Sequence, residues 1–452
     1  MNNKLNSGYV DDKGNSLKNS AYDLSRCVMT NVDGDERDIR NMVGNMSITE
    51  NIFSPTLVLQ LGIRDESNFI EEFNITGSET LDIEIITKAG GVERVLTFLF
   101  YVQVYDDYAR SANDNQVQAY TLVAVSEHAY IAPLKTISRV VEGTNTSLIQ
   151  SIFEDDLNIE GFIVEGTCGT QVKKNINISN PIIAAEQLLS SAADINRTPY
   201  FLYQDISASM NLRSLSAIND RDENPVYKTF RNTKTIKDTS GTGIEHYERS
   251  TQMTKVISNI GLSPSSQAKN GAFASENRYI DISSKTYRTK IFDASLELDA
   301  QYTTSKGLNH FNQKLKTRGV NEEENPLTRI PQANTNYQYV NPDSYSNAMS
   351  TSELDEQQSH ISRAYIAGYD TCAHSFTVMG DTFLNPGRTI ELLFPKATDP
   401  IIYKKYTGKS DTDQYDRTLS GDYLIFSAVH RFVAGVHTTE LIAKTDSLKP
   451  YE

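Results

Sequence analysis

Residues 380–446 constrain the fold of this chain most, because they contain two strand-forming halves joined by turn residues. In the first half, Asn385-Pro386-Gly387 indicates a turn, since proline fixes φ and glycine accepts a positive φ. The run 388–394 after that turn is apolar and favours a strand. In the second half, residues 422–432 alternate loosely, and Ala434-Gly435 interrupts them before another strand pattern. This order predicts a small antiparallel barrel or sandwich.

The first part of the chain, residues 22–131, carries a second strand-rich pattern. Leu81, Ile83 and Ile85 alternate with acidic residues, which is typical of a strand with one buried face. Other strand patterns occur at similar spacing before and after these residues, over 43–49, 55–61, 95–104 and 118–126. Five or six strands arranged in this way predict a closed barrel, which leaves no unpaired sheet edge.

The apolar period becomes helical over residues 135–218. Thr146-Ser147 is placed to cap a helix whose apolar residues lie at helical spacing over 148–157. Asn180-Pro181 predicts the start of a second helix, because proline is favoured at the first helical position. Residues 200–203 favour a strand, so this segment predicts a mixed α+β domain.

Two segments, LNPGRTI at 384–390 and GDYLIFSAVHRF at 421–432, resemble the C-terminal barrel of the baseplate hub proteins of contractile-tailed bacteriophages. The strand pattern over 77–85 is similar to a strand of that family's first tube-like barrel. The helix, helix, strand order over 135–218 is similar to the family's middle domain, which related spike proteins of type VI secretion share. The similarity leaves residues 219–361 as a region larger than a simple hub needs.

The resemblance implies an α+β, mainly β fold: two tube-like antiparallel β-barrel domains, a mixed α+β middle domain and a long polar loop region. The expected divisions are a flexible N-terminal arm (1–20), the first tube-like β-barrel (21–134), the middle α+β domain (135–240), a region that supplies either early strands of the second barrel or a return to the middle domain (241–320), a polar loop or linker (321–360), and the second tube-like β-barrel with a C-terminal tail (361–452).

The resemblance also implies a structural, non-enzymatic protein of the virion tail baseplate that is assembled in the host cytoplasm. In that role a homotrimer forms a pseudo-six-fold ring and joins the hexameric tail tube to the trimeric central spike. The implied partners are the central spike protein, a tail tube or tube-initiator protein and other baseplate proteins, and DNA passes through the lumen without specific binding. The alternatives are a tail-associated peptidoglycan-degrading enzyme and the hub of a type VI-like contractile injection apparatus.

Composition limits the partners of the chain. A formal net charge of −15 argues against a surface that grips nucleic acid, since phosphate binding relies on Lys and Arg. No apolar run reaches the roughly 18 residues of a membrane helix, so no membrane insertion is expected, and the N-terminus has no apolar signal-peptide core. Cys27, Cys168 and Cys372 are far apart, which favours reduced thiols over a disulfide framework or a cysteine-only zinc site.

Few residues form a catalytic or metal-ligating pattern. Cys372 and His374 stand two apart and share a predicted strand face, which is compatible with a Cys/His nucleophile pair. We interpret them instead as a buried thiol beside an imidazole. His430 and His437 would make a metal site if they approached this pair across the barrel, but no two histidines have helical ligand spacing. We therefore predict no catalytic, cofactor-binding or metal-binding residues, and no cofactor.

Three other patterns have structural interpretations. The carboxylate pairs Asp155-Asp156 and Glu71-Glu72 lie on polar faces, without the apolar cleft in which a glycosidase raises one pKa. Residues 161–170 contain three glycines but lack the Lys-Ser/Thr of a phosphate loop, and we interpret them as a hairpin. A set of aromatic residues favours core or interface packing over base stacking, because no basic groove accompanies them. These residues are Phe98, Phe100, Tyr101, Tyr105 and Tyr108.

Overall fold

The protein is mainly β, with large antiparallel sheets, as the sequence predicts. The computed structural model describes residues 20–73, 75–89, 92–110, 117–169, 171–232, 250–259, 273–281, 285–304, 314–315, 325–326, 332–340, 353–369, 372–396, 415–416 and 419–446. Apart from Ser20, the expected N-terminal arm lies outside the described residues.

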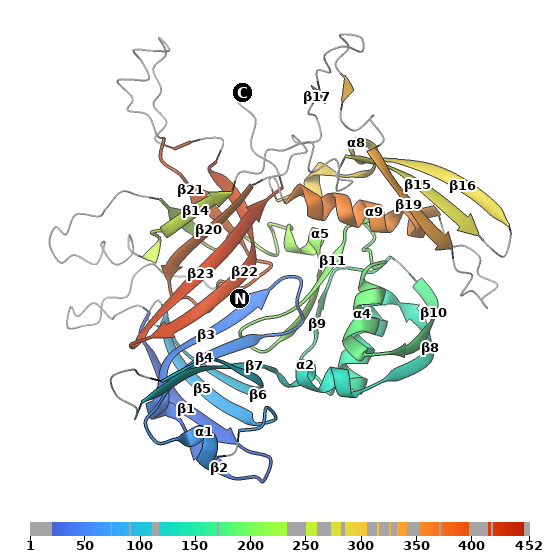
Figure 1. Ribbon diagram of the computed structural model, residues 1–452. Coiled ribbons are helices and arrows are strands. Elements are labelled where there is room, and N and C mark those ends of the chain that lie inside the picture. Colours follow the sequence, from blue (N-terminus) through green and yellow to red (C-terminus); the bar gives the residue numbers. More distant parts are fainter. Residues whose placement is uncertain are drawn as a thin grey trace, which may run out of the picture.

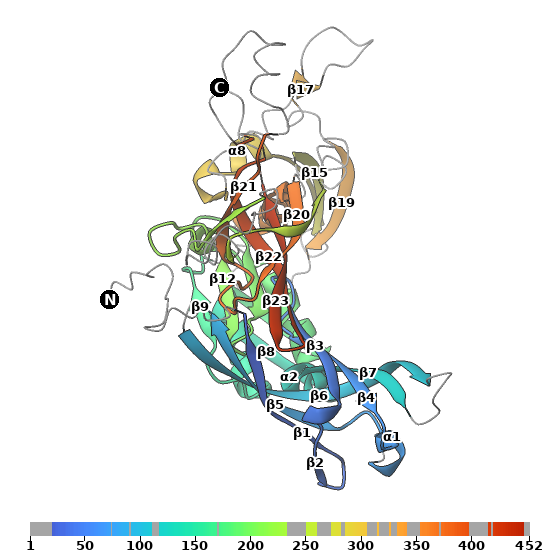
Figure 2. The same ribbon diagram turned by 90° about the vertical axis from the view of Figure 1, so that its left-hand side faces the viewer.

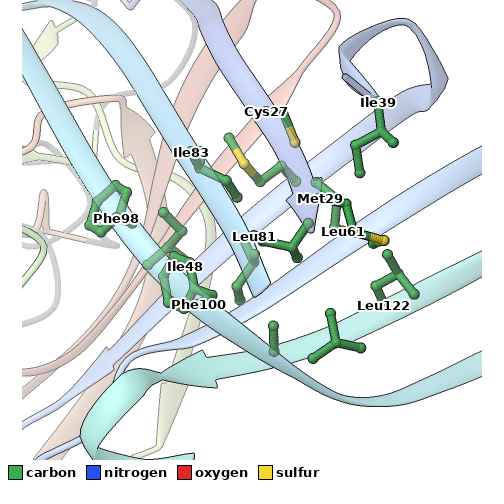
Figure 3. Packing of buried hydrophobic residues seen from close by; sticks show 14 of the residues in the cluster. Cys27, Met29, Ile39, Ile48, Leu61, Leu81, Ile83, Phe98, Phe100 and Leu122 are labelled. Atoms are coloured by element: carbon green, nitrogen blue, oxygen red, sulfur yellow. The ribbon is translucent and has the colours of Figure 1, made fainter. Parts of the chain in front are cut away.

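The N-terminal strands follow the predicted alternation. They are β1 (Tyr22–Thr30), β2 (Glu36–Asp38), β3 (Val43–Asn51), β4 (Val58–Asp65), β5 (Thr80–Ala89), β6 (Val92–Arg110) and β7 (Gln118–Ser126), with the short helix α1 (Phe69–Glu72) between β4 and β5. In β5, Leu81 and Ile83 are fully buried, whereas Asp82 between them is partly exposed. Figure 3 shows Leu81 and Ile83 among buried side chains that include Met29 and Phe100. One face of these strands therefore forms an apolar core.

The C-terminal strands form on both sides of the predicted turn. They are β20 (Cys372–Met379), β21 (Thr389–Leu393), β22 (Gly421–Val433) and β23 (Val436–Thr445), joined by β13 (Thr229–Arg231) and β14 (Thr254–Asn259) from earlier in the chain. Gly387 has a φ of +79° in the turn before β21, and Gly435 has a φ of +76° between β22 and β23. Both glycines therefore take the conformation for which a turn selects glycine.

The N-terminal and C-terminal strands belong to one sheet of 13 strands, ordered β14-β20-β23-β22-β3-β4-β7-β6-β5-β1-β2, with β21 paired to β22 and β13 paired to β21. β22 pairs antiparallel with β3, and Figure 1 shows the two strands side by side although they lie at opposite ends of the chain. The hairpin β22–β23 also meets the start of β1, where the His437 amide donates to the Ser20 carbonyl at 2.7 Å. The two predicted strand regions are therefore joined directly, through the β22–β23 hairpin.

The middle region is a mixed α+β unit. Its elements are α2 (Glu127–Ile131), β8 (Ile137–Thr144), α3 (Asn145–Ser151), β9 (Ile163–Glu165), β10 (Gln171–Ser179), α4 (Pro181–Leu189), β11 (Tyr200–Gln204), β12 (Met210–Ser214) and α5 (Leu215–Ile218), and a π-helical turn (Ile152–Asp156) follows α3. The apolar residues of α3, α4 and β8 to β12 contribute to one cluster, whereas Leu215 and Ile218 of α5 belong to a neighbouring cluster.

Both predicted helices of the middle region are present. Asn180 caps α4, since its side-chain oxygen accepts from the Ile182 amide at 2.8 Å. The first helix begins two residues earlier than predicted, because Thr144 is the residue whose hydroxyl accepts from the Ser147 amide. The hairpin predicted over 161–170 is wrong: β9 pairs in parallel with β12, whereas β10 pairs with β8. Glycines mark turns, but they do not decide which strands pair.

Residues 219–361 hold a further sheet and helix. Strands β15 (Ala274–Asp281), β16 (Thr286–Asp293) and β19 (Gln332–Val340) form a three-stranded sheet beside α8 (Ala294–Glu297) and α9 (Glu353–Gly368), and β17 (Lys314–Leu315) pairs with β18 (Asn325–Pro326). Figures 1 and 2 place this sheet and α8 at the end of the molecule opposite β1 and β2. The polar loop predicted over 321–360 is wrong where β19 and the first half of α9 occur, because backbone pairing with β15 makes a strand without an apolar sequence pattern.

Candidate functional site

Cys372 and His374 lie on the same buried face of β20, as their spacing predicts. Both side chains are fully buried, and the Cys372 sulfur lies 3.4 Å from Nε2 of His374. The Tyr423 hydroxyl of β22 lies 3.2 Å from the same nitrogen, and the Ser258 hydroxyl of β14 lies 2.8 Å from Nδ1. The imidazole therefore links β20 to two other strands of the sheet.

Burial sets the protonation of this cysteine and histidine. It raises the pKa of the Cys372 thiol and lowers the pKa of His374 to about 4. Both groups are therefore neutral near pH 7, and the thiolate that a cysteine nucleophile needs is disfavoured. The geometry supports a buried thiol beside a core imidazole rather than a nucleophile pair.

His430 of β22 and His437 of β23 form a second buried polar group with Glu50 of β3. Nε2 of His430 lies 2.7 Å from Oε1 of Glu50, and its Nδ1 lies 3.1 Å from Nε2 of His437. The other carboxylate oxygen of Glu50 accepts from the Ile206 amide at 2.8 Å. Burial raises the pKa of Glu50 and lowers that of His437 well below its usual value.

The structure thus brings His430 together with His437, as the metal-site hypothesis required, but the third member is Glu50 rather than Cys372 or His374. Among the described residues, no group of three or more His, Cys, Asp or Glu side chains is arranged to hold a metal ion. Sequence reasoning missed Glu50, although the alternation of β3 contains the signal. Met46 and Ile48 face the core, and Glu50 follows them at the same period of two.

The predicted acidic pairs make local contacts on the surface. Asp156 forms an ion pair with Arg139 at 2.8 Å, and Asp155 accepts from the Ser151 hydroxyl at 2.6 Å. Glu71 accepts from the side chain of Asn68 at 2.5 Å. These contacts fix the π-helical turn and α1, and they place the carboxylates on polar faces as predicted.

The predicted aromatic residues divide between core and surface. Phe98 and Phe100 are buried and stack at a centroid distance of 5.4 Å, which confirms core packing for these two rings. Tyr101 stacks on Tyr130 of α2 at 4.8 Å. Tyr108 is 45% exposed near the end of β6, and the side chain of Tyr105 lies outside the described residues.

Two hollows mark the surface of the described residues. One, of about 300 Å³, lies on the exposed face of the sheet beside the far end of β6, and its lining includes Gln60, Asp106 and Arg431. The other, of about 650 Å³, lies beside α5 and includes Asp220 and Arg221. Both are open and polar. No helix among the described residues is long and apolar enough to cross a membrane.

Comparison with known proteins gives matches of structure only. No protein-family model matches the chain, and no curated protein is similar to it in sequence. The fold is similar to that of a tail protein from Neisseria meningitidis, with 9% identity, a TM-score of 0.52, and coverage of 94% of this chain and 97% of the other. The chain therefore has the fold of a tail protein over nearly its whole length, and the resemblance found in the sequence is confirmed at the level of the fold.

Two further solved structures align with lower scores. The 43 kDa tail protein of prophage MuSo2 from Shewanella oneidensis has 12% identity and a TM-score of 0.46, with coverage of 93% of this chain and 98% of that protein. A type VI secretion component of E. coli, described as structurally similar to bacteriophage T4 tail proteins, has 7% identity and a TM-score of 0.41, with coverage of 95% and 79%.

Proposed function

We propose that this protein is the central hub of a phage tail baseplate. In this role three copies form a ring with pseudo-six-fold symmetry, which joins the hexameric tail tube to the trimeric central spike and leaves a lumen for DNA. The observation that carries the proposal is the fold, which matches a tail protein across 94% of this chain and 97% of the other. Because that identity is only 9%, the role rests on architecture rather than on individual residues.

The sheet gives this proposal a physical basis. Two strand-rich regions per chain, each contributing one tube-like barrel, would place six similar units in a trimer, which suits a six-fold tube on one side and a three-fold spike on the other. The pairing of β22 with β3 fixes one region against the other within each copy. A symmetry adaptor requires the two regions to be held rigidly, since the angle between them determines how the copies close into a ring.

The domain boundaries belong to the same proposal. The first barrel comprises residues 21–134, the middle domain 135–240, and the second barrel 361–452 together with strands from 241–320. The pairing of β14 with β20 supports assigning the start of 241–320 to the second barrel. Strands β15 and β16 of this range instead form a sheet with β19, which lies beyond it, and this supports treating them as a separate addition to the hub.

Light scattering of the purified chain tests the proposed function. A particle of about three times the chain mass of 50.6 kDa, formed alone or only after the spike protein is added, is the expected result. The matched measurement adds the tail tube protein from the same genome, which should join the trimer and not a monomer. A monomer that ignores both partners contradicts the hub role, and peptidoglycan hydrolysis would then be assayed.

A further inference from the structure

The buried group formed by Glu50, His430 and His437, here called the seam cluster, lies where the N-terminal strands meet the β22–β23 hairpin. Its three side chains are at most 1% exposed. Burying a carboxylate and two imidazoles costs free energy that apolar side chains would not, unless every polar atom is paired. The seam cluster joins β3, β22, β23 and the turn between β11 and β12, through the Ile206 amide.

Other titratable groups around the seam cluster are held by their own partners. Asp205, on the β11–β12 turn, accepts from the Ser209 amide and the Asn211 side chain. Asp381, on the loop before β21, accepts from the Tyr227 hydroxyl at 3.0 Å. Further titratable groups nearby are also partnered: Tyr22 of β1 stacks edge-on against Phe432, Lys228 lies 3.7 Å from Asp381, and Arg431 pairs with Glu440 on the exposed face.

Hydrogen-bond counting limits how many protons the seam cluster holds. With Glu50 ionised and both imidazoles neutral, His430 Nε2–H donates to Glu50 and His437 Nε2–H donates to His430 Nδ1, so each contact contains one proton. One further proton fits, because His430 can carry a proton on each ring nitrogen and donate to both Glu50 and His437. His437 then accepts at Nε2 and keeps its own proton on Nδ1, against the backbone of Gly380. A second further proton must enter a contact that already contains one, so it sets two donors face to face.

We propose that the seam cluster is a proton-sensitive latch, which holds the N-terminal strands to the β22–β23 hairpin near neutral pH and releases this seam in acid. The inference does not depend on the proposed hub role. The release is local because β3–β22 is the strand pairing that the cluster spans, whereas β4–β7 is paired elsewhere in the same sheet. The burial that lowers the pKa of His437 places the release below the usual titration range of histidine, about pH 6.5.

Hydrogen exchange of the full chain at about pH 7.5 and about pH 5 tests the latch, with rates corrected for the intrinsic effect of pH. Relative to the amides of β4 and β7, which follow the general decline in stability with acid, the amides of β3 and β22 are expected to lose roughly tenfold or more protection. This comparison needs no variant. Equal loss in both strand pairs, or no loss in either, would overturn the proposal.

The variant His437→Phe assigns the effect to the seam cluster. A phenyl ring keeps the stacking of residue 437 on Phe432, where the ring centroids lie 4.4 Å apart, but removes one proton acceptor. The acid-induced loss of protection in β3 and β22 should fall to less than about half of the wild-type effect. His374→Phe replaces a buried histidine outside the cluster and should leave the excess loss in β3 and β22, relative to β4 and β7, unchanged. If both variants behave alike, the latch is wrong.

Discussion

Phe432 shows how one residue of the C-terminal hairpin serves the N-terminal core. It belongs to β22, yet its buried ring packs with the interior side chains of β1 and β3 to β7, 5.0 Å from the ring of Tyr22. We expect Phe432→Ala to lower the free energy of unfolding by about 3–5 kcal/mol, since it leaves a cavity in that core. The neighbouring Val433→Ala is the control, because Val433 is 47% exposed and should cost less than about 1 kcal/mol. Urea unfolding measures both, and equal losses would contradict this packing.

Two glycines with the same backbone conformation allow the cost of backbone strain to be distinguished from the cost of a steric clash. Gly387 and Gly435 have φ values of +79° and +76°, so alanine is strained at either position by roughly 1–2 kcal/mol. At Gly387 an added Cβ would also clash with the buried Tyr203 hydroxyl, whereas at Gly435 nothing lies within 4 Å. We therefore expect Gly387→Ala to cost more than Gly435→Ala in a denaturant titration. The reverse order would show that Tyr203 moves away without cost.

Residues differ in whether their structural role can be predicted from the local sequence. Gly387 is predictable, because the Asn-Pro-Gly order specifies a turn from local chemistry alone. Glu50 is not, because its partner His430 lies 380 positions away and only the sheet brings them together. The clustering of His430 with His437 follows from the hairpin between β22 and β23, which the sequence does indicate.

At the scale of single elements, α4 offers a test of a predicted helix start. The Asn180 side chain accepts from the Ile182 amide, so Asn180→Ala leaves that donor without its cap and should cost about 1 kcal/mol. Asn180→Asp keeps the acceptor and should cost a few tenths at most. Thermal unfolding compares the two variants. Equal stability of both would show that the cap contributes nothing to this helix.

Elements with a strong apolar period are predictable, and elements formed by pairing alone are not. The buried apolar residues of β5 recur every second position, and those of α4 recur at helical spacing. Local sequence therefore predicts both elements. β19 has no such period and exists through its backbone pairing with β15. α9 is intermediate: its buried apolar residues begin at Ile361, so the polar turns before that residue read as a loop.

At the scale of the whole molecule, the joining of the two strand regions depends on long-range pairing. The seam places residues 45–51 against residues 427–433, and no local pattern encodes such a register. The sequence therefore predicts two strand-rich regions and a middle domain, but not the single sheet of 13 strands that unites the first with the last. A change at the seam is expected to affect β3 of the first region and β22 of the last region together.

The buried histidines give the whole molecule a pH dependence with a definite sign. Burial lowers the pKa values of His360 and His374 to about 4 and that of His437 well below its usual value, so the folded chain keeps them neutral. The unfolded chain protonates them below about pH 6.5, so unfolding takes up protons and stability falls with acid by up to about 1.4 kcal/mol per pH unit for each histidine. The raised pKa of Glu50 acts in the opposite direction, but it is one group against three.

Denaturant titrations between about pH 7.5 and about pH 5 should show this decline in the free energy of unfolding. His374→Gln should reduce the slope of that free energy against pH by about one proton. A stability that stays constant over this range would mean that the histidines take up as many protons in the folded chain as in the unfolded chain.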